Sequence, residues 1–581
     1  MTLLTAMPPW LPVFAAAAVV ALVGRHTGRG GGRRAGHVFA AVTAAGVAGW
    51  LYVVPAGAHL GTRLFGFEVV LFAVDPFSRA VGLVLAVAAV ANVAYAHGTG
   101  ASTRATATAL CYVGASLGAV FAGDWLTLVV WWELMAVTAT ALVWQSPEAV
   151  RAGYRYAVYH QLGGATLVAG VLLHYARVGT FLFGDGLATG LPGAGLAAGL
   201  PTTLALLGVG MNVGFLGLHV WVVDAYPRPH VATTVFLSGF TTKVGVYTLV
   251  RVDPDGRLVA TMGAAMVLVG VTMAVLQTDV RRLLSYHIVS QVGYMVVGIG
   301  LATAAGRAAG IAHLVNNVLY KTFLFMVAGV VILATGRESL KKVGGLGREL
   351  PVTAVAFVVA ALSITGIPGF AGFVSKGFVT SATDAAGGDA LYWALQVGAV
   401  GTVVSFVKFG YYAFLRDAPD GQSVADGTVG PAVAVAFAVL AVPCVVFGLA
   451  PGVFAAILPP GVSTAGVFSV SKLTDAVVIT AVGTVAFAAI RRPLARVTAV
   501  PDLEALYHPA GRRLLDATNR TSARVGETLD RTGHRLLVAA YATAVDPDTF
   551  DDLALTRPTI GSAVLLLVVV AALGLVVVLT G

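Results

Sequence analysis

Five ionisable side chains lie inside apolar segments that are long enough to cross a membrane. They are Glu133, Lys243, His313, Lys321 and Lys376. An ionisable group inside a membrane helix costs a few kcal/mol or more, and it usually marks an ion or proton route. Because burial disfavours the charged form, a neighbouring charge can make such a group take up or release a proton. These residue types therefore predict proton transfer within a membrane.

The positions of these residues in their segments support this interpretation. Lys243 lies in the apolar run 231–250, about 10 Å from its nearer end at a rise of 1.5 Å per residue. A lysine stem can snorkel over part of that distance, but not comfortably over all of it. Glu133 is the only acid in its apolar segment. His313 and Lys321 are eight residues apart, so they share one helix face two turns apart.

Four of these residues also have a purely structural interpretation. Glu133 could be a carboxyl group bonded to backbone or arginine, and His313 could be a hydrogen-bonded core histidine. Lys243 could snorkel, and Lys376 could be an interfacial lysine. Lys408 lies nearer the end of its segment, VVSFVKFGYYAFLRD, where snorkelling and a role in transport are equally compatible with its position.

Composition defines the elements that must hold these groups. The chain has 581 residues and is 58% hydrophobic and 11% charged, whereas soluble domains are about 25% charged. About sixteen apolar runs are long enough to span a bilayer, and the run near 68–96 is expected to be one helix. An all-α polytopic protein of the cell membrane is therefore predicted.

Loop arginines and lysines account for the net charge of +9, so nucleic acid is not an expected partner. The distribution of these basic residues among the loops predicts that both termini lie outside.

Metals and other cofactors are not expected. Cys111 and Cys444 both lie in apolar runs, and two cysteines cannot form an iron–sulfur cluster. No third ligand is spaced with His219 and His230 to make a metal site. The glycines of GVGMNVG follow no predicted strand, which argues against nucleotide binding. The chain is therefore expected to have no redox or catalytic centre of its own.

Glycine and proline interrupt the segment that leads to Lys376. The interrupting residues are Gly366, Pro368, Gly369 and Gly372. Non-helical backbone at membrane depth is tolerated only against protein or a wet cavity. A broken helix beside a lysine is the pattern expected at an ion path. A second break is expected at Pro227 and Pro229, just before the segment that contains Lys243.

The C-terminal part differs in kind from the rest. Residues 493–557 are polar and basic, with apolar residues at helical spacing, which predicts an amphipathic helix along the cytoplasmic face. A disordered basic linker is the alternative. Residues 558–581 are expected to form a final membrane anchor.

Several motifs together resemble one known family. They are WWELM, LHVWVVDAYP, FLSGFTTKVGVYTLVR, DVRRLLSYHIVSQVGYM, HLVNNVLYKTFLF, GGLGRELP and GIPGFAGFVSK. The set resembles the antiporter-like subunits shared by respiratory complex I and the Mrp multisubunit Na+/H+ antiporters, and it is most similar to the D-type Mrp subunits. The resemblance covers roughly residues 70–470.

The resemblance implies two inverted five-helix repeats, each with a broken helix. The implied divisions are N-terminal helices over 1–106, a first repeat over 107–250, a second repeat over 251–415, C-terminal helices over 416–492, the lateral helix over 493–557 and the anchor over 558–581. It also implies a hydrated polar axis in which Glu133, Lys243, His313, Lys321 and Lys376 carry protons. His219 and Asp224 of the LHVWVVDAYP motif, and Lys408, are expected to support this path.

Two positions depart from the family pattern. The family usually has a lysine seven residues before the histidine of its PxHxW motif, as the partner of the glutamate. Here that position is Asn212, and the proline is Gly217. The usual second histidine, four residues after His313, is Asn317. Because an amide cannot carry a lysine's charge, Asn212 and Asn317 are expected to hold ordered water in the path.

The resulting functional prediction is a proton-translocating subunit of a multisubunit Na+/H+ antiporter. Its expected partners are other membrane subunits, lipids, H+ and Na+. One alternative is a proton-pumping subunit of NADH:quinone oxidoreductase or of a membrane-bound hydrogenase. Others are an energy-coupling subunit of an inorganic-carbon uptake complex and a structural membrane component that conducts nothing.

Overall fold

The structure is a computed structural model of the whole chain. It describes residues 7–26, 31–184, 187, 199–254, 256–425, 427–497, 500, 502, 505, 513 and 520. Contacts divide the chain into two units, 1–502 and 503–581, and helices α1 to α21 belong to the first. The predicted amphipathic helix therefore lies almost wholly outside the described residues, and the predicted anchor over 558–581 lies entirely outside them.

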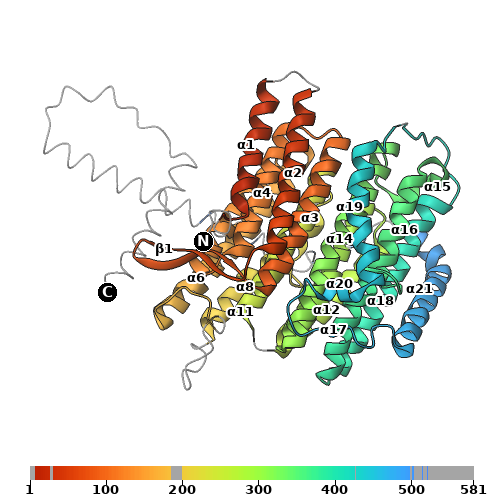
Figure 1. The fold of residues 1–581 in the computed structure, drawn as a ribbon. Helices are drawn as coiled ribbons and strands as arrows, with labels where there is room; N and C mark the ends of the chain where they lie inside the picture. Colours follow the sequence, from red (N-terminus) through yellow and green to blue (C-terminus); the bar gives the residue numbers. More distant parts are fainter. Residues whose placement is uncertain are drawn as a thin grey trace. The chain divides into compact units, whose positions relative to one another are not determined.

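Within the described residues, ten helices are long and apolar enough to cross a membrane. They are α2 (Gly31–Val53), α3 (Pro76–Gly98), α5 (Trp125–Val143), α6 (Val150–Val178, preceded by η1, Pro147–Ala149), α12 (Arg257–Leu276), α13 (Val280–Gly300), α14 (Ala304–Thr335), α18 (Asp389–Gly410, followed by η3, Tyr411–Leu415), α19 (Pro431–Leu449) and α21 (Val470–Arg496). Further helices are α1 (Trp10–His26), α4 (Thr103–Phe121), η2 (Leu340–Lys342), α15 (Leu346–Glu349) and α20 (Pro451–Ala455). The predicted class of helical polytopic membrane protein is confirmed (Figure 1).

Among the described residues, three helix pairs are interrupted within or near an apolar run. They are α8 (Leu200–Val213) with α9 (Val220–Ala225), α10 (Val231–Gly239) with α11 (Thr241–Val252), and α16 (Pro351–Thr365) with α17 (Ala371–Ala385). The break between α16 and α17 lies where the sequence predicts it. There Gly366 at φ +83° and Gly369 at φ +90° adopt a backbone region that is open mainly to glycine.

The break predicted at Pro227 and Pro229 is confirmed, because α9 ends at Ala225 and α10 begins at Val231, just before the segment that contains Lys243. These prolines lie between α9 and α10, where one helix has ended and the next has not begun. The interruption before them lies at Gly214 and Gly217, with φ of +79° and +91°. The one after them is at Phe240, which joins α10 to α11 directly after Gly239, a glycine without a positive φ.

The apolar run near 68–96 is not one helix. Its first part is strand β2 (Phe67–Val74), which pairs antiparallel with β1 (Gly57–Leu64). Phe65 and Gly66 both have positive φ, as a tight hairpin turn requires. Helix α3 begins only after Asp75, which accepts a hydrogen bond from the Ser78 N–H, with Pro76 in its first turn.

Helices α13 and α14 form the most enclosed part of the bundle. The most apolar stretch of α13 is buried throughout and that of α14 is 83% buried, against 17% for α21. Helix α13 packs tightly on α12, where a Cβ on Gly263 would lie 2.6 Å from the Val297 backbone nitrogen. Helix α14 contacts α10 and α11 and also α16 and α17, so two of the interrupted pairs pack against it.

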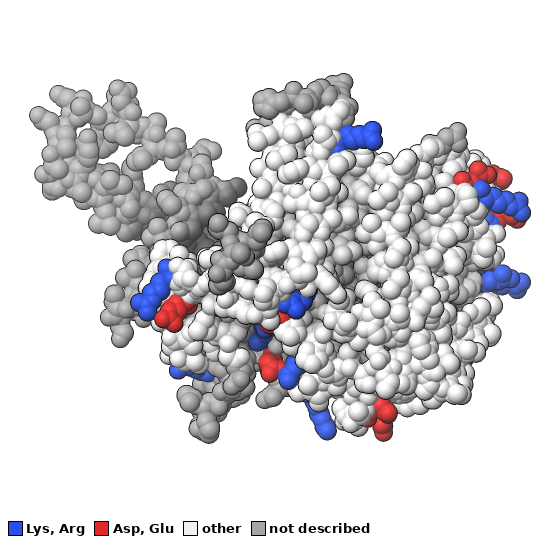
Figure 2. All heavy atoms as spheres, in the orientation of Figure 1, with Lys and Arg blue, Asp and Glu red and all other residues white. Residues whose placement is uncertain are grey.

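The outer surface is apolar over wide areas. Figure 2 shows a face that is largely white, with few Lys, Arg, Asp or Glu side chains. Exposed side chains include Val130, Val137, Trp393 and Val485. A surface of this kind suits contact with lipid or with other membrane subunits.

Candidate ion-translocation site

Two buried lysines lie at helix interruptions. Lys243 Nζ donates to the Ser238 carbonyl at 2.8 Å and to Thr242 Oγ1 at 3.1 Å, just past the end of α10. Lys376 Nζ donates to the Ile364 carbonyl at 2.8 Å, at the end of α16. The last carbonyls of a helix lack internal donors and carry partial negative charge. Each break therefore gives an ammonium group a site without supplying a full negative charge.

Two further lysines also donate to main-chain carbonyls. Lys321, on the enclosed helix α14, donates to the Leu284 carbonyl of α13 at 3.0 Å, and its Nζ lies 6.0 Å from the ring centre of Phe406. Lys408 donates to the carbonyls of Val275 and Gln277 at 2.6 Å, at the end of α12. Lys408 is 5% exposed, so it is enclosed by the bundle despite its position near the end of α18.

None of these four lysines forms an ion pair with a carboxylate among the described residues. A buried charge is normally retained only when it is paired or well hydrogen-bonded. Carbonyl dipoles alone let a lysine lose its proton without leaving an unpaired carboxylate behind. The arrangement therefore suits groups that change their protonation state.

His313 connects α14 to the interrupted helix α17. Its Nδ1 is hydrogen-bonded to Ser375 Oγ at 3.1 Å, and Ser375 precedes Lys376 in the chain. Its Nε2 is hydrogen-bonded to the Tyr320 hydroxyl at 3.3 Å. That hydroxyl donates to Gln291 Oε1 on α13, also at 3.3 Å. His313 and Lys376 thus lie in one region. The hydrogen bond to Tyr320 joins this region to the residue that precedes Lys321 on α14.

Sequence reasoning missed Tyr320, Ser375 and Gln291 as members of this network. Tyr320 could have been found, because it lies seven residues after His313 and therefore on the same helix face. Ser375 and Gln291 carry no such signal, since each joins the network from another helix.

Buried asparagine side chains retain unused hydrogen-bonding atoms. Neither the oxygen nor the nitrogen of the Asn212 side chain has a partner among the described residues. Asn317 donates to the Tyr320 hydroxyl at 3.2 Å, while its own oxygen has no such partner. Buried polar atoms are nearly always satisfied by protein or by ordered water. These atoms are therefore suitable places for water.

Glu133 lies apart from the lysines. It is half-buried on α5, accepts a hydrogen bond from Gln161 of α6 at 3.2 Å, and packs against Gly164. It forms no ion pair with any described residue. The Glu133 carboxylate therefore lies between two helices near the surface of the bundle rather than within the lysine cluster.

His219 and Asp224 have different environments. The buried His219 begins α9, and its Nε2 lies 3.4 Å from Asp502 Oδ1. Asp224 lies 3.4 Å from an Arg155 guanidinium nitrogen and 3.9 Å from one of Arg228. Asp224 thus belongs to an ion-pair group near the end of α9, away from the lysine contacts.

Asp124 fixes the start of α5, the helix that carries Glu133. Its carboxylate accepts hydrogen bonds from the Thr127 N–H, the Thr127 hydroxyl and the Val70 N–H at 2.7–2.8 Å. Burial raises the pKa of Asp124, and these hydrogen bonds oppose that shift. The hairpin strand β2 is thereby tied to the N-terminus of α5.

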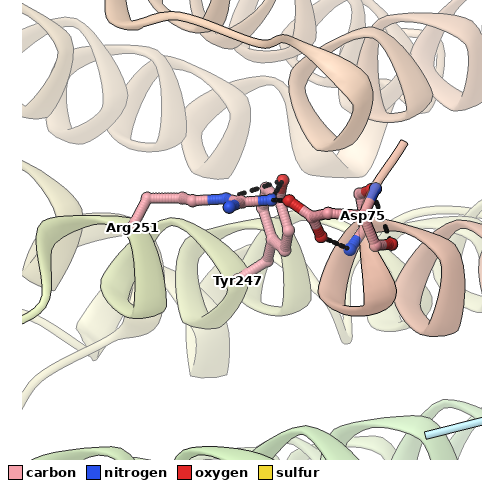
Figure 3. Close-up of polar contacts among 4 residues, drawn as sticks. Asp75, Tyr247 and Arg251 are labelled. Carbon is pink, nitrogen blue, oxygen red and sulfur yellow. Dashed lines mark hydrogen bonds and ion pairs between the residues drawn. The ribbon is translucent and has the colours of Figure 1, made fainter. Parts of the chain in front are cut away.

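Arg251 fixes the far end of α11, the helix that carries Lys243. Figure 3 shows its guanidinium between the Asp75 carboxylate and the Tyr247 hydroxyl. Asp75 is also the N-cap of α3, so one contact joins the end of α11 to the start of α3. The ring of Phe183 lies 5.2 Å from the guanidinium carbon.

Arg251→Gln is expected to lower stability without altering a transport group. The variant leaves Asp75 and Tyr247 without their charged partner, which costs about 1–3 kcal/mol. A fall in the thermal midpoint of the purified protein measures this loss. Arg63→Gln is the matched control, because the Arg63–Glu68 pair is 74% and 66% exposed and should contribute little. Equal midpoints for the two variants would contradict the assignment.

These features define a class: a polytopic helical membrane protein with buried lysines at interrupted helices. Residues 122–404 match the family model described as NADH:quinone oxidoreductase/Mrp antiporter, TM. The chain therefore belongs to this family, and it carries the family's transmembrane domain over those residues.

Two curated relatives and one solved structure show what the chain is similar to. It is 31% identical over 326 residues to the D-type Na(+)/H(+) antiporter subunit of Alkalihalophilus pseudofirmus, covering 54% of this chain and 66% of the relative. It is 30% identical over 329 residues to the N-type NADH-quinone oxidoreductase subunit of Desulforudis audaxviator, with the same two coverages. The chain thus spans about two thirds of the length of these relatives. A chain of the Mrp complex from a Dietzia species has the same fold, with a TM-score of 0.70, 24% identity, and coverage of 83% of this chain and 100% of that one.

Proposed function

We propose that this chain is a proton-translocating subunit of a multisubunit Na+/H+ antiporter. One observation carries the proposal. The buried lysines Lys243, Lys321, Lys376 and Lys408 all donate to main-chain carbonyls, and none is paired with a carboxylate among the described residues. Enclosed lysines of this kind are costly in a bilayer, and proton transfer gives them a role.

Protons move along this path because charges in neighbouring positions influence one another. Two unit charges about 6–7 Å apart interact by roughly 2–3 kcal/mol at an effective dielectric constant of about 20. That energy changes a protonation ratio roughly a hundredfold. Charging or discharging Lys243 therefore biases Lys321, and Lys321 with His313 biases Lys376. Glu133 supplies the acidic group at the start of the path.

The position of Glu133 supports assembly with other membrane subunits. Glu133 is half-buried, and Val130 and Val137 on the same helix are each 55% exposed. A neighbouring subunit on this face would cover the apolar side chains and supply a charged partner for Glu133. The complex lies in the cell membrane, with both termini of this chain outside.

Redox-driven proton pumping is the second candidate function. It is favoured by the similarity to the N-type NADH-quinone oxidoreductase subunit, which is nearly as strong as the similarity to the D-type antiporter subunit. The same lysines would then carry protons, with the driving force supplied by a redox module elsewhere in the complex.

Inverted membrane vesicles distinguish the two functions. The chain is expressed with its co-encoded subunits, a pH gradient is established, and Na+ is added. Collapse of the gradient by Na+ is expected, and it should disappear when this chain alone is omitted. A wild-type preparation that does not respond to Na+ but pumps protons when a quinone substrate is reduced would overturn the antiporter function.

Asn212→Lys is expected to be tolerated or to enhance transport. The substitution places a lysine where the family usually has one. Position 212 lies on α8, which packs beside α11, the helix that carries Lys243. The added charge can bias the path directly, whereas Asn212 acts only through water. The initial rate of Na+-dependent gradient collapse measures the effect, with Asn212→Leu as the control that removes both polar atoms. An inactive Asn212→Lys variant that assembles normally would contradict this role.

A further inference from the structure

We propose that Asp475, on α21, receives the proton that leaves Lys376 and releases it at the end of the bundle where α18 and α21 begin. The inference rests on the proposed function and adds an exit group to it. Helix α21 lies beyond the residues 122–404 that match the family model.

A cavity connects the two groups. It has a volume of about 70 Å³, and Lys376, Asp475, Lys472, Gln396, Thr380 and Tyr294 contribute to its lining. A single water needs about 10–15 Å³ by this measure, so the cavity has room for several. Its polar side chains supply the partners that ordered water requires.

Asp475 and Lys472 face this cavity without protein partners. Both are half-buried, and neither forms an ion pair or a side-chain hydrogen bond with a described residue. They are three residues apart and therefore neighbours on one face of α21. A carboxylate in a membrane-crossing helix is costly unless water or a charge reaches it. The cavity meets this need, since it has room for water and two lysines line it together with Asp475.

The depths of the residues suit an exit. Asp475 lies five residues, about 7–8 Å, from the first residue of α21. Lys376 lies nine residues, about 13–14 Å, from the last residue of α17. Gln396, which also lines the cavity, is seven residues from the start of α18. The cavity thus extends from the interrupted helix toward one membrane surface.

The proton step is balanced within these groups. The Lys376 ammonium gives a proton to cavity water, and that water passes one to the Asp475 carboxylate, leaving a neutral amine and a carboxylic acid. The acid then loses its proton to bulk water and becomes a carboxylate again. Lys472, three residues before Asp475 on α21, lines the same cavity beside the carboxylate that releases the proton. Tyr294 and Lys376 are the other titratable groups that face the cavity.

Asp475→Asn in the complete complex tests the role of the carboxylate. Na+-dependent gradient collapse should slow at least about tenfold, with little change in the Na+ concentration for half-maximal rate. Asp475→Glu should restore most of the rate, because it retains the carboxylate. Asp384→Asn is the control, since Asp384 is an exposed acid on α17. A wild-type rate in an assembled Asp475→Asn complex overturns the inference.

Filling the cavity provides a second test that leaves every titratable group in place. Gly377 lines the cavity, and a Cβ added to it would meet no atom within 4 Å. Gly377→Leu should therefore fold, displace water and slow transport, while the smaller Gly377→Ala should have little effect. Gly49→Leu is the control, because a Cβ there also meets no atom within 4 Å and lies on α2.

The outcomes separate the inference from the function on which it rests. If the wild-type complex exchanges Na+ for H+ while both Asp475→Asn and Gly377→Leu transport normally, only the exit route is wrong. If the wild-type complex shows no exchange, the proposed function fails and the exit route fails with it. Slow transport in both variants, with rescue by Asp475→Glu, supports the route.

Discussion

Lys243→Ala is expected to abolish Na+-dependent proton movement, with a loss of at least about a hundredfold in initial rate. The substitution removes an ammonium group that donates to Ser238 and Thr242 at the junction of α10 and α11. No other lysine or arginine lies on either helix except Arg251, whose guanidinium is held by Asp75 and Tyr247. Vesicle measurements of gradient collapse, normalised to the amount of assembled complex, provide the test.

Lys243→Arg separates a structural charge from a proton carrier. Arginine keeps a positive charge under all ordinary conditions and does not release its proton. If Lys243 transfers or alternately holds a proton, Lys243→Arg should be nearly as inactive as Lys243→Ala. Lys342→Ala, which changes an exposed lysine at the end of η2, should leave the rate unchanged. An active Lys243→Arg complex would show that only a fixed charge is needed.

Glu133→Gln is expected to cause a comparably large loss of transport. Glutamine has nearly the same shape, so the contacts with Gln161 and Gly164 can be kept while the acid is lost. Glu133→Asp should retain part of the activity, because it retains a carboxyl group. Glu148→Gln is the matched control, since Glu148 is an exposed acid before α6. Full activity in Glu133→Gln would remove the acid from the path and leave only the lysines and His313.

The sequence indicated the ionisable groups because a charge inside an apolar run is a local signal. It also indicated the break before Lys376, since Gly366 and Gly369 adopt backbone angles that other residues disfavour. The break at Phe240 has no glycine in that backbone region, since Gly239 before it has no positive φ. It is associated with the Lys243 ammonium at the end of α10, a contact that becomes visible only once both helices are placed.

Partners that come from other helices were beyond sequence reasoning. The carbonyl acceptors of the lysines are main-chain atoms, which carry no residue signature. Ser375 and Gln291 reach His313 and Tyr320 through tertiary packing. The hairpin was missed for a different reason: strand β2 is as apolar as a membrane helix, and only Asp75 and Pro76 mark where α3 begins.

The most direct test of the account is Na+-driven proton movement by the purified complex in proteoliposomes, comparing wild type with Lys321→Met. Lys321 lies on the enclosed helix α14 and donates to α13, between the region of Lys243 and that of Lys376. A Na+ gradient should drive a measurable change in internal pH in the wild type, and Lys321→Met should abolish that change without altering assembly. Wild-type proton movement in the Lys321→Met complex would contradict a proton path through these buried lysines.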